Sequence, residues 1–244
     1  MHPINEFYLG LRKTERGFDL PTLWNLSPTM IGLQYFYIEW LFPVNQASKW
    51  NKHAPLLLGD DLDFFKQNEE IQQNYLTSFD KIILPGVGAF KDAMTCLKEH
   101  ELDKAVHAFA KTGKPLLGIC LGMQLLFESS EEFGQSEGLG LIEGSVVRFD
   151  SRKFSQHLKI PHMGWNELHV HQNTPLFKDM PSSFYLYFVH SFHVQCPEEF
   201  IIGKTTYGYE FASAVQKNNV YGFQPHPEKS HANGLAILKN FVEL

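Results

Sequence analysis

Two kinds of segment alternate along the chain after residue 80. Lys81–Leu84 and 115–119 are short apolar runs without alternation, which is typical of strands buried on both faces of a sheet. Residues 90–111 and 121–127 carry apolar side chains at helical spacing, and the first of these stretches ends near Gly113, a residue type that favours helix C-caps. The strand–helix–strand–helix order predicts a parallel sheet covered on both faces.

The second half of the chain consists of short strand-like runs separated by turn residues. Lys217-Asn218-Asn219-Val220 has the composition of a tight hairpin connection, and residues 231–242 have apolar side chains at the spacing of a core-facing helix. We therefore expect an α/β fold whose sheet gains antiparallel strands in its second half. The strands predicted here are 145–149, 167–170, 185–190, 192–195, 201–206, 212–216 and 220–224.

The first eighty residues carry weaker signals. Residues 1–30 have scattered aromatics and prolines with no period of 2 or 3.6, which leaves open an extension, an irregular cover or a poorly ordered arm. Residues 34–40 are aromatic and β-branched and predict a first strand, and 45–52 predict a helix. We expect an N-terminal extension over residues 1–33 and one domain over residues 34–244.

Composition and charge exclude several classes of protein. Of the 244 residues, 43% are hydrophobic and 20% charged, which is the balance of a soluble globular protein. No apolar run is long enough to span a bilayer, and the first residues lack the layout of a signal peptide. The net charge is -6 without a dense Lys/Arg stripe, which argues against nucleic acid as a partner.

The chain has three cysteines, Cys96, Cys120 and Cys196, and this small, odd number does not suit a disulfide framework. They suit a reducing compartment, so we expect a cytoplasmic protein. Cys96 lies inside a predicted helix and Cys196 has no base nearby in sequence, so both are interpreted as core filler.

Cys120 differs because it lies in Gly118-Ile119-Cys120-Leu121-Gly122-Met123-Gln124. A nucleophile on a sharp strand-to-helix turn needs small neighbours, and glycines stand two residues to either side of this thiol. The helix that follows would direct backbone N–H groups at the sulfur and favour the thiolate. The alternative is a buried structural cysteine in a glycine-rich turn.

Two further motifs complete a candidate catalytic set. In Gln224-Pro225-His226-Pro227-Glu228-Lys229, a histidine that could hold a thiol proton is followed by an acid that could orient it. Alone, this pair would be interpreted as surface loop residues. In Pro85-Gly86-Val87-Gly88, a glycine-rich loop after a strand could aim N–H groups at an oxyanion, although it lacks the Gly-Lys-Ser/Thr of a phosphate loop.

The order and wording of the three motifs resemble the class I (triad) glutamine amidotransferases. Within that superfamily the chain is similar to the glutaminase subunits of imidazole glycerol phosphate synthase, through Gly-Leu-Gly-Leu-Ile-Glu-Gly at 138–144 and Pro-His-Met-Gly-Trp-Asn at 161–166. The resemblance covers about residues 35–244. It implies a flavodoxin-like, mainly parallel central sheet flanked by helices, and it implies no cofactor and no metal.

The resemblance also implies a mechanism. Cys120 attacks the side-chain amide carbon of glutamine, while His226, held by Glu228, moves the proton to the leaving ammonia; water then hydrolyses the thioester. The oxyanion would be held by Leu121 and by the loop at Gly86, Val87 and Gly88. The positions that surround glutamine in the family are Gln124, Glu132, His190, Ser191 and Phe192.

In the family, ammonia passes to a (β/α)8-barrel synthase subunit, which here implies a heterodimer that forms imidazole glycerol phosphate and AICAR in histidine biosynthesis. The residues that fall at the partner interface are Trp165, Asn166, Tyr187 and Lys229. His162 and His193 are interpreted as structural or partner-facing. His169 and His171 lack a third ligand nearby, so no metal site is expected.

One departure keeps other functions open. The family opens with Asp-Tyr-Gly-x-Gly-Asn, whereas residues 39–45 here read Glu-Trp-Leu-Phe-Pro-Val-Asn without either glycine. Residues such as Leu and Pro cannot easily adopt the backbone shapes that glycine permits, so the departure calls partner-triggered activation into question. The alternatives are a paralogue that supplies ammonia to another synthase, such as a nucleotide-sugar amidotransferase for surface polysaccharide, a stand-alone cysteine hydrolase, and an inactive interaction subunit.

Overall fold

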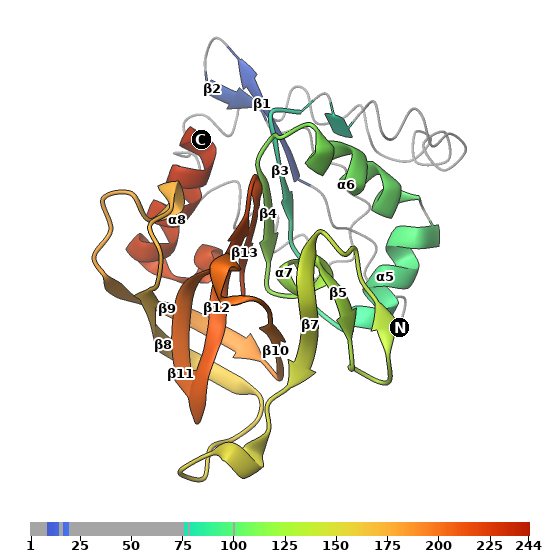
Figure 1. Ribbon diagram of the computed structural model, residues 1–244. Helices are drawn as coiled ribbons and strands as arrows, with labels where there is room; N and C mark the ends of the chain where they lie inside the picture. Colours follow the sequence, from blue (N-terminus) through green and yellow to red (C-terminus); the bar gives the residue numbers. More distant parts are fainter. Residues whose placement is uncertain (1–8, 15–16, 20–75, 78, 100) are drawn as a thin grey trace.

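The computed structural model describes residues 9–14, 17–19, 76–77, 79–99 and 101–244, drawn in colour in Figure 1. Within this part of the chain a 13-stranded mixed sheet has the path β2-β1-β3-β4-β13-β12-β10-β7-β5-β6, and β11, β8 and β9 extend it from β12. The strands are β1 (Leu9–Thr14), β2 (Gly17–Asp19), β3 (Lys81–Leu84), β4 (Leu116–Ile119), β5 (Phe127–Ser130), β6 (Ser136–Glu137), β7 (Ile142–Arg148), β8 (His162–Val170), β9 (Ser183–His190), β10 (Phe192–Gln195), β11 (Ile201–Tyr207), β12 (Tyr209–Lys217) and β13 (Val220–Phe223).

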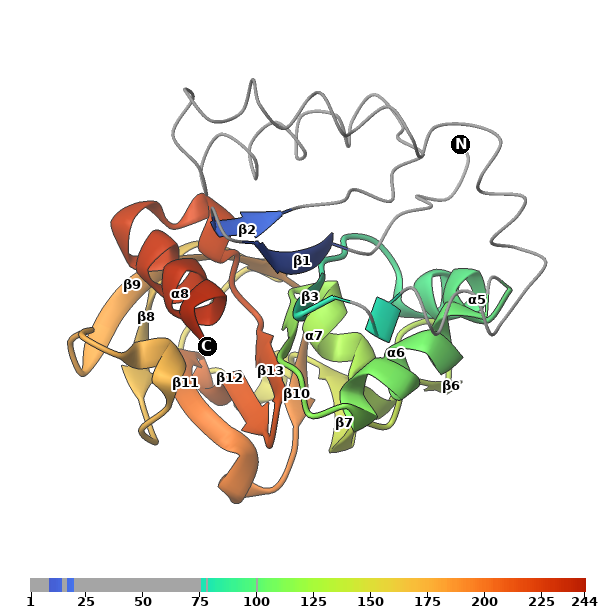
Figure 2. The same ribbon diagram turned by 90° about the horizontal axis from the view of Figure 1, so that it is seen from above.

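Helices cover the two faces of this sheet, as Figures 1 and 2 show. The helices are α5 (Phe90–Glu99), α6 (Leu102–Lys111), α7 (Leu121–Leu125) and α8 (His231–Glu243). Figure 2 shows α5 and α6 on one side of the central strands and α8 on the other. Alternate residues of β3 enter two separate hydrophobic clusters, Ile82 and Leu84 in one and Ile83 in the other, so the three residues after Lys81 are all apolar.

The expected fold class is confirmed. β3 and β4 pair in parallel, β4 and β13 pair in parallel, and the later strands β7 to β12 form mostly antiparallel ladders. The hairpin at 217–220 joins β12 to β13, with Lys217 opposite Val220 and Asn218 at φ 54°. The last helix, α8, spans the segment that the apolar spacing predicted.

Two helix predictions were wrong in extent. Residues 90–111 form two helices because Glu101 adopts a left-handed backbone (φ 55°) between α5 and α6. Leu97 and Leu102, the core positions on either side, are five residues apart, so a single helix could not turn both inward. Helix α7 ends at Leu125, and residue 127 already belongs to β5.

The sequence signals also missed four strands. β5 and β6 are short and rich in Ser and Glu, a composition without strand signature. In the segment without periodicity, β1 lies antiparallel to β3, with Leu9 opposite Ile83, and carries β2 at the edge of the sheet. The strand predicted at 34–40, the helix at 45–52 and the turn at 39–45 lie outside the described residues.

The register of the central strands positions the candidate site. Gly118 of β4 lies opposite Gly222 of β13, and Ile119 lies opposite Phe223. Because the two strands are parallel, the residues that follow them emerge at the same edge of the sheet. Cys120 and His226, about a hundred positions apart in sequence, are thereby brought to one place.

The glycines beside Cys120 are required by close backbone approach. A Cβ on Gly122 would lie 1.7 Å from the carbonyl oxygen of Leu84, and one on Gly118 would lie 2.6 Å from the carbonyl oxygen of Gly122. These carbonyls belong to the backbone and cannot swing away as a flexible side chain could. The turn that carries the thiol therefore needs glycine at both positions.

We predict that Gly122→Ala lowers the free energy of unfolding by more than about 4 kcal/mol, because β3 and α7 must move apart. The matched control is Gly113→Ala, where a Cβ meets open space at φ +77° and only the left-handed backbone costs about 1–2 kcal/mol. Denaturant titration followed by circular dichroism measures both variants. Equal losses in the two variants would contradict this explanation.

Candidate active site

Cys120 occupies the turn between β4 and α7 with an unusual backbone, φ 54° and ψ -112°. Non-glycine residues rarely adopt positive φ, and such strain gathers at functional sites where the surrounding structure enforces it. Here the enforcing contact is a short hydrogen bond from the Cys120 N–H to the carbonyl oxygen of Phe223, 2.7 Å long. The thiol is therefore held in a defined position at the end of β4.

His226 and Glu228 form a buried pair. The distance from His226 Nδ1 to Glu228 Oε1 is 2.6 Å, and both side chains are almost fully inaccessible to solvent. The backbone of His226 is fixed as well, because its N–H donates to the carbonyl oxygen of Tyr187 and its carbonyl accepts from the Ser230 hydroxyl. His226 Nε2 has no other hydrogen-bond partner among the described residues and is left for the Cys120 thiol.

The charge state of His226 follows from its partners. Burial lowers its pKa, but the side chains of Cys120 and Glu228 outweigh burial and raise the pKa to about 10. An imidazolium at neutral pH stabilises a thiolate beside it, and the thiolate is the nucleophilic form of cysteine. The three residues thus have the arrangement of a nucleophile, a proton carrier and an orienting acid.

A cavity of about 310 Å³ opens over the Cys120 sulfur. It brings together most of the residues that the sequence proposed, from five separate stretches of chain. Those that line it are Val87, Gly88, Cys120, Leu121, Gln124, Glu132, His190, Ser191, Phe192 and His226.

Some predicted residues lie outside this cavity. Gly86 packs under the loop against Leu121, and Glu228 lies behind His226. Sequence reasoning missed Pro161 and Val189, which also line the cavity. Neither residue type signals a site by itself.

Of the residues assigned to a partner interface, two lie on β8, one lies on β9 and one directly follows Glu228. Trp165 is 47% exposed and stacks on His231 at 5.0 Å, with Tyr187 at its edge. Asn166 is half-buried behind Trp165, and Lys229 is exposed directly after Glu228. None of these four side chains lines the cavity over Cys120.

Two buried amides connect the cavity to the sulfur. Gln124 Nε2 donates to the carbonyl oxygen of Phe192 (3.3 Å) and to Gln224 Oε1 (3.0 Å). Gln224 Nε2 in turn lies 3.8 Å from Cys120 Sγ. Both N–H groups of Gln124 are therefore used inside the protein, and its Oε1 is the atom left to accept from a bound molecule. Gln224 was not singled out from the sequence, although it stands two residues before His226.

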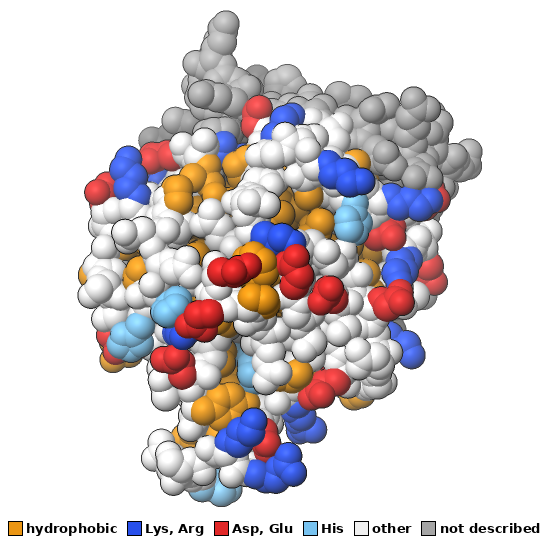
Figure 3. All heavy atoms as spheres, in the orientation of Figure 1, with side chains coloured by type: hydrophobic (Ala, Val, Ile, Leu, Met, Phe, Trp, Pro, Cys, Tyr) orange, Lys and Arg blue, Asp and Glu red, His pale blue; other side chains and the backbone are white. Residues whose placement is uncertain are grey.

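Other features of the described residues do not form a second site of this kind. No group of three His, Cys, Asp or Glu side chains in this part of the chain could hold a metal ion. None of the helices described is long and apolar enough to cross a membrane. Lys and Arg side chains are interspersed with Asp and Glu across the face shown in Figure 3.

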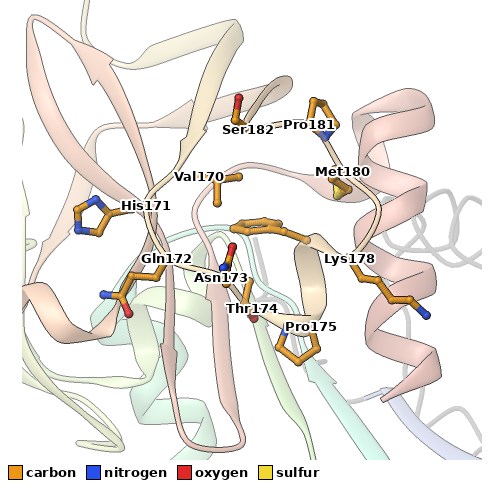
Figure 4. Close-up of a pocket in the computed structure, with 11 residues that line it drawn as sticks. Val170, His171, Gln172, Asn173, Thr174, Pro175, Lys178, Met180, Pro181 and Ser182 are labelled. Carbon is orange, nitrogen blue, oxygen red and sulfur yellow. The ribbon is translucent and has the colours of Figure 1, made fainter.

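A second pocket, of about 760 Å³, lies beside the end of β8. Figure 4 shows that its polar side chains do not converge: His171 and Lys178 point away from each other and from the hollow. A binding site needs a few polar groups aimed at one point, and the cavity over Cys120 has them.

Comparison with known proteins agrees with this geometry. The class-I glutamine amidotransferase family matches residues 46–244. The chain belongs to this family.

Among curated relatives of this amidotransferase are proteins named imidazole glycerol phosphate synthase subunit HisH. That of Sulfurimonas denitrificans is 60% identical, over 68% of this chain and 80% of the relative. That of Wolinella succinogenes is 54% identical, over 73% and 88%, and that of Methanosarcina mazei is 52% identical, over 68% and 80%. These identities place the amidotransferase in the HisH branch of the family.

Solved structures support the fold of the amidotransferase. The glutaminase domain of Trypanosoma brucei CTPS with bound acivicin superposes with a TM-score of 0.57 at 17% identity, over 89% of this chain and 91% of that chain. The PurLQS structure from Thermotoga maritima gives a TM-score of 0.52 at 20% identity, over 68% and 80%. At these identities the similarity establishes the fold alone.

We predict that Cys120→Ala lowers the pKa of His226 from about 10, because the hydrogen bond with the Cys120 side chain is the largest of the contributions that raise this pKa. An NMR titration of the imidazole nitrogens from about pH 5 to about pH 11 measures the change. Cys196→Ala is the matched control, since the Cys196 thiol makes no contact with His226 and should leave this pKa unchanged. An unchanged His226 pKa in Cys120→Ala would show that the thiol does not share its proton.

Proposed function

We propose that this chain is the glutaminase subunit of an imidazole glycerol phosphate synthase. It hydrolyses glutamine to glutamate and ammonia with Cys120, His226 and Glu228, and passes the ammonia to a HisF-type (β/α)8-barrel subunit in the cytoplasm. The observation that carries the proposal is the buried pair of His226 and Glu228, 2.6 Å apart, directed at a thiol on a strained turn. The identities of 52–60% to HisH proteins support the choice of pathway.

The first chemical step uses the charge state of the triad. The Cys120 thiolate forms a bond to the side-chain amide carbon of glutamine, and the carbonyl electrons move onto oxygen. As the tetrahedral intermediate collapses, the C–N bond breaks and His226 gives its Nε2 proton to the departing ammonia. Neutral His226 then takes a proton from water, which attacks the thioester and releases glutamate and the thiolate.

The oxyanion has donors on two sides of the sulfur. The N–H of Leu121 follows the nucleophile, as in other nucleophile turns, and the loop at Gly86, Val87 and Gly88 supplies N–H groups from the other side. Gly88 has φ +112°, which only glycine adopts without strain. Removing one such donor costs about 2.7–4 kcal/mol of transition-state stabilisation.

The cavity offers two side-chain oxygens that could accept hydrogen bonds from the α-ammonium group of glutamine. Gln124 can offer Oε1 because both of its N–H groups are engaged elsewhere. Glu132 lines the cavity with a carboxylate, of which Oε2 accepts from the Phe90 N–H at 2.7 Å. An ammonium group is recognised by such a neutral and charged oxygen pair. Ser191 and its neighbours in the 190–192 segment form the opposite wall.

The partner surface is argued from exposed apolar groups beside the site. Met163 is 62% exposed and Trp165 47% exposed on β8, next to Tyr185 on β9. Tyr187 and Lys229 extend this surface, and Asn166 lies behind it. Exposed aromatic and methionine side chains are enriched at protein interfaces, and their position allows a barrel subunit to cover the glutaminase site.

The experiment measures glutamate release from glutamine, by the chain alone and together with the barrel subunit and its substrate. A large rise on adding both supports the proposal, and Cys120→Ala must abolish release in either case. No rise, with a thiol that still reacts with a glutamine-like electrophile, would favour the alternative synthase that the altered 39–45 turn suggested.

We predict that Glu228→Gln lowers kcat for glutamine hydrolysis on the order of 10⁴-fold, because an amide no longer stabilises the imidazolium of His226. Glu143→Gln is the matched control: Glu143 pairs with Lys217 on the surface, 2.7 Å away, and its loss should leave kcat within about twofold. Steady-state glutamate release measures both. Comparable activity in the two variants would contradict the orienting role of Glu228.

A further inference from the structure

A row of hydrogen bonds runs behind the glutamine cavity from β8 to β10. Asn166 Nδ2 lies 3.2 Å from His162 Nε2, and His162 Nδ1 lies 2.9 Å from His190 Nε2. His190 Nδ1 lies 2.7 Å from the carbonyl oxygen of Phe192, which is the same oxygen that accepts from Gln124. His162 itself does not line the cavity.

Both ends of this row have a fixed polarity. At one end the Phe192 carbonyl can only accept. At the other end the amide of Asn166 is oriented by two backbone groups, since its Nδ2 donates to the carbonyl oxygen of Thr206 and its Oδ1 accepts from the N–H of Glu167. The group that Asn166 turns toward His162 is therefore a donor.

With both ends fixed, two neutral histidines have one arrangement. His190 must carry its proton on Nδ1 to donate to Phe192, so its Nε2 accepts; His162 must then donate from Nδ1 and accept from Asn166 at Nε2. Burial keeps both rings neutral, because it lowers the pKa of His162 to about 4 and the pKa of His190 well below its ordinary value. Every donor points from Asn166 toward the cavity.

The ring of His162 is also held in its plane. It stacks on Tyr207, with centroids 4.0 Å apart, and on Phe188, with centroids 4.8 Å apart. The opposite tautomer of His190 would direct a lone pair at the Phe192 oxygen 2.7 Å away, and the two would repel. The carbonyl would turn, and Gln124 would lose one of the two acceptors that orient its amide.

We propose that His162 is a positioning residue for glutamine hydrolysis, which fixes the tautomer of His190 and thereby the Phe192 carbonyl and the Gln124 amide that face the substrate. The inference deepens the proposed function and rests on it. His162 acts on glutamine only through His190, so its loss affects the binding of glutamine more than the bond-breaking step. A structural role alone would lower stability and leave KM for glutamine unchanged.

The first test is spectroscopic and needs no activity. Imidazole ¹⁵N shifts of the wild-type chain at neutral pH are expected to show both His162 and His190 neutral with the proton on Nδ1. Assignments come from His162→Phe and His190→Phe. A proton on Nε2 of either ring, or a charged ring, would overturn the proposal even in a fully active enzyme.

The second test separates positioning from stability by kinetics of the complex with its barrel subunit. His162→Phe keeps the stacking but removes both hydrogen bonds, and is expected to raise KM for glutamine about tenfold with a smaller change in kcat. His162→Asn retains a donor near the position of Nδ1 and should recover most of the loss. Failure of the rescue, or a loss confined to kcat, would overturn the proposal.

His193→Phe is the matched control. His193 is equally buried in the same aromatic cluster and also makes two hydrogen bonds, to the carbonyl oxygen of Val194 and to the Tyr209 hydroxyl, but it does not line the cavity or join the row. It should lower the melting temperature about as much as His162→Phe and leave KM unchanged. An equal rise of KM in His193→Phe would show a general packing effect and overturn the proposal.

A wild-type complex without glutaminase activity would instead reject the proposed function. The tautomers of His162 and His190 would then be decided by the first test, which needs no activity.

Discussion

The lack of space between β3 and the start of α7 is the constraint on which the site depends. The carbonyl of Leu84 lies so close to Gly122 that no side chain fits, and this contact brings the loop after β3 next to the turn that holds Cys120. Nucleophile and oxyanion loop are thus assembled by the same backbone packing. The strained backbone of Cys120 is maintained because β4, which leads into it, is paired with β3 on one side and with β13 on the other.

Histidines in similar surroundings have opposite charge states here. His226, His162, His190 and His193 are all buried, and burial alone lowers the pKa of each. Only His226 has a carboxylate and a thiol as partners, and they reverse the shift. The other three are bonded to neutral amides, carbonyls, a hydroxyl or each other. The type of hydrogen-bond partner therefore decides which imidazole can exchange a proton during turnover.

The parts of the site that local sequence encodes could be predicted. Cys120 between two glycines and His226 two residues before Glu228 are short-range patterns, and the apolar runs of β3 and β4 signal buried strands. The contacts of Gln224 and His162 with the site could not be predicted in this way, because most of their partners are distant in sequence and a buried amide or histidine has no pattern of its own. The break at Glu101 was missed for a related reason: helical spacing on both sides concealed a change of phase between Leu97 and Leu102.

The pairing of β4 with β13 has a consequence for how this enzyme fails. Because Cys120 and His226 are carried on the ends of adjacent strands, the distance between sulfur and imidazole is inherited from the spacing of a sheet that is buried on both faces. A distortion anywhere along these two strands therefore changes the distance between the reacting atoms, even when no residue of the site is substituted. The rate of glutamine hydrolysis would then fall at temperatures or denaturant concentrations at which most of the secondary structure is still present. Turnover would therefore report a loss of core packing earlier than a measurement of secondary structure does.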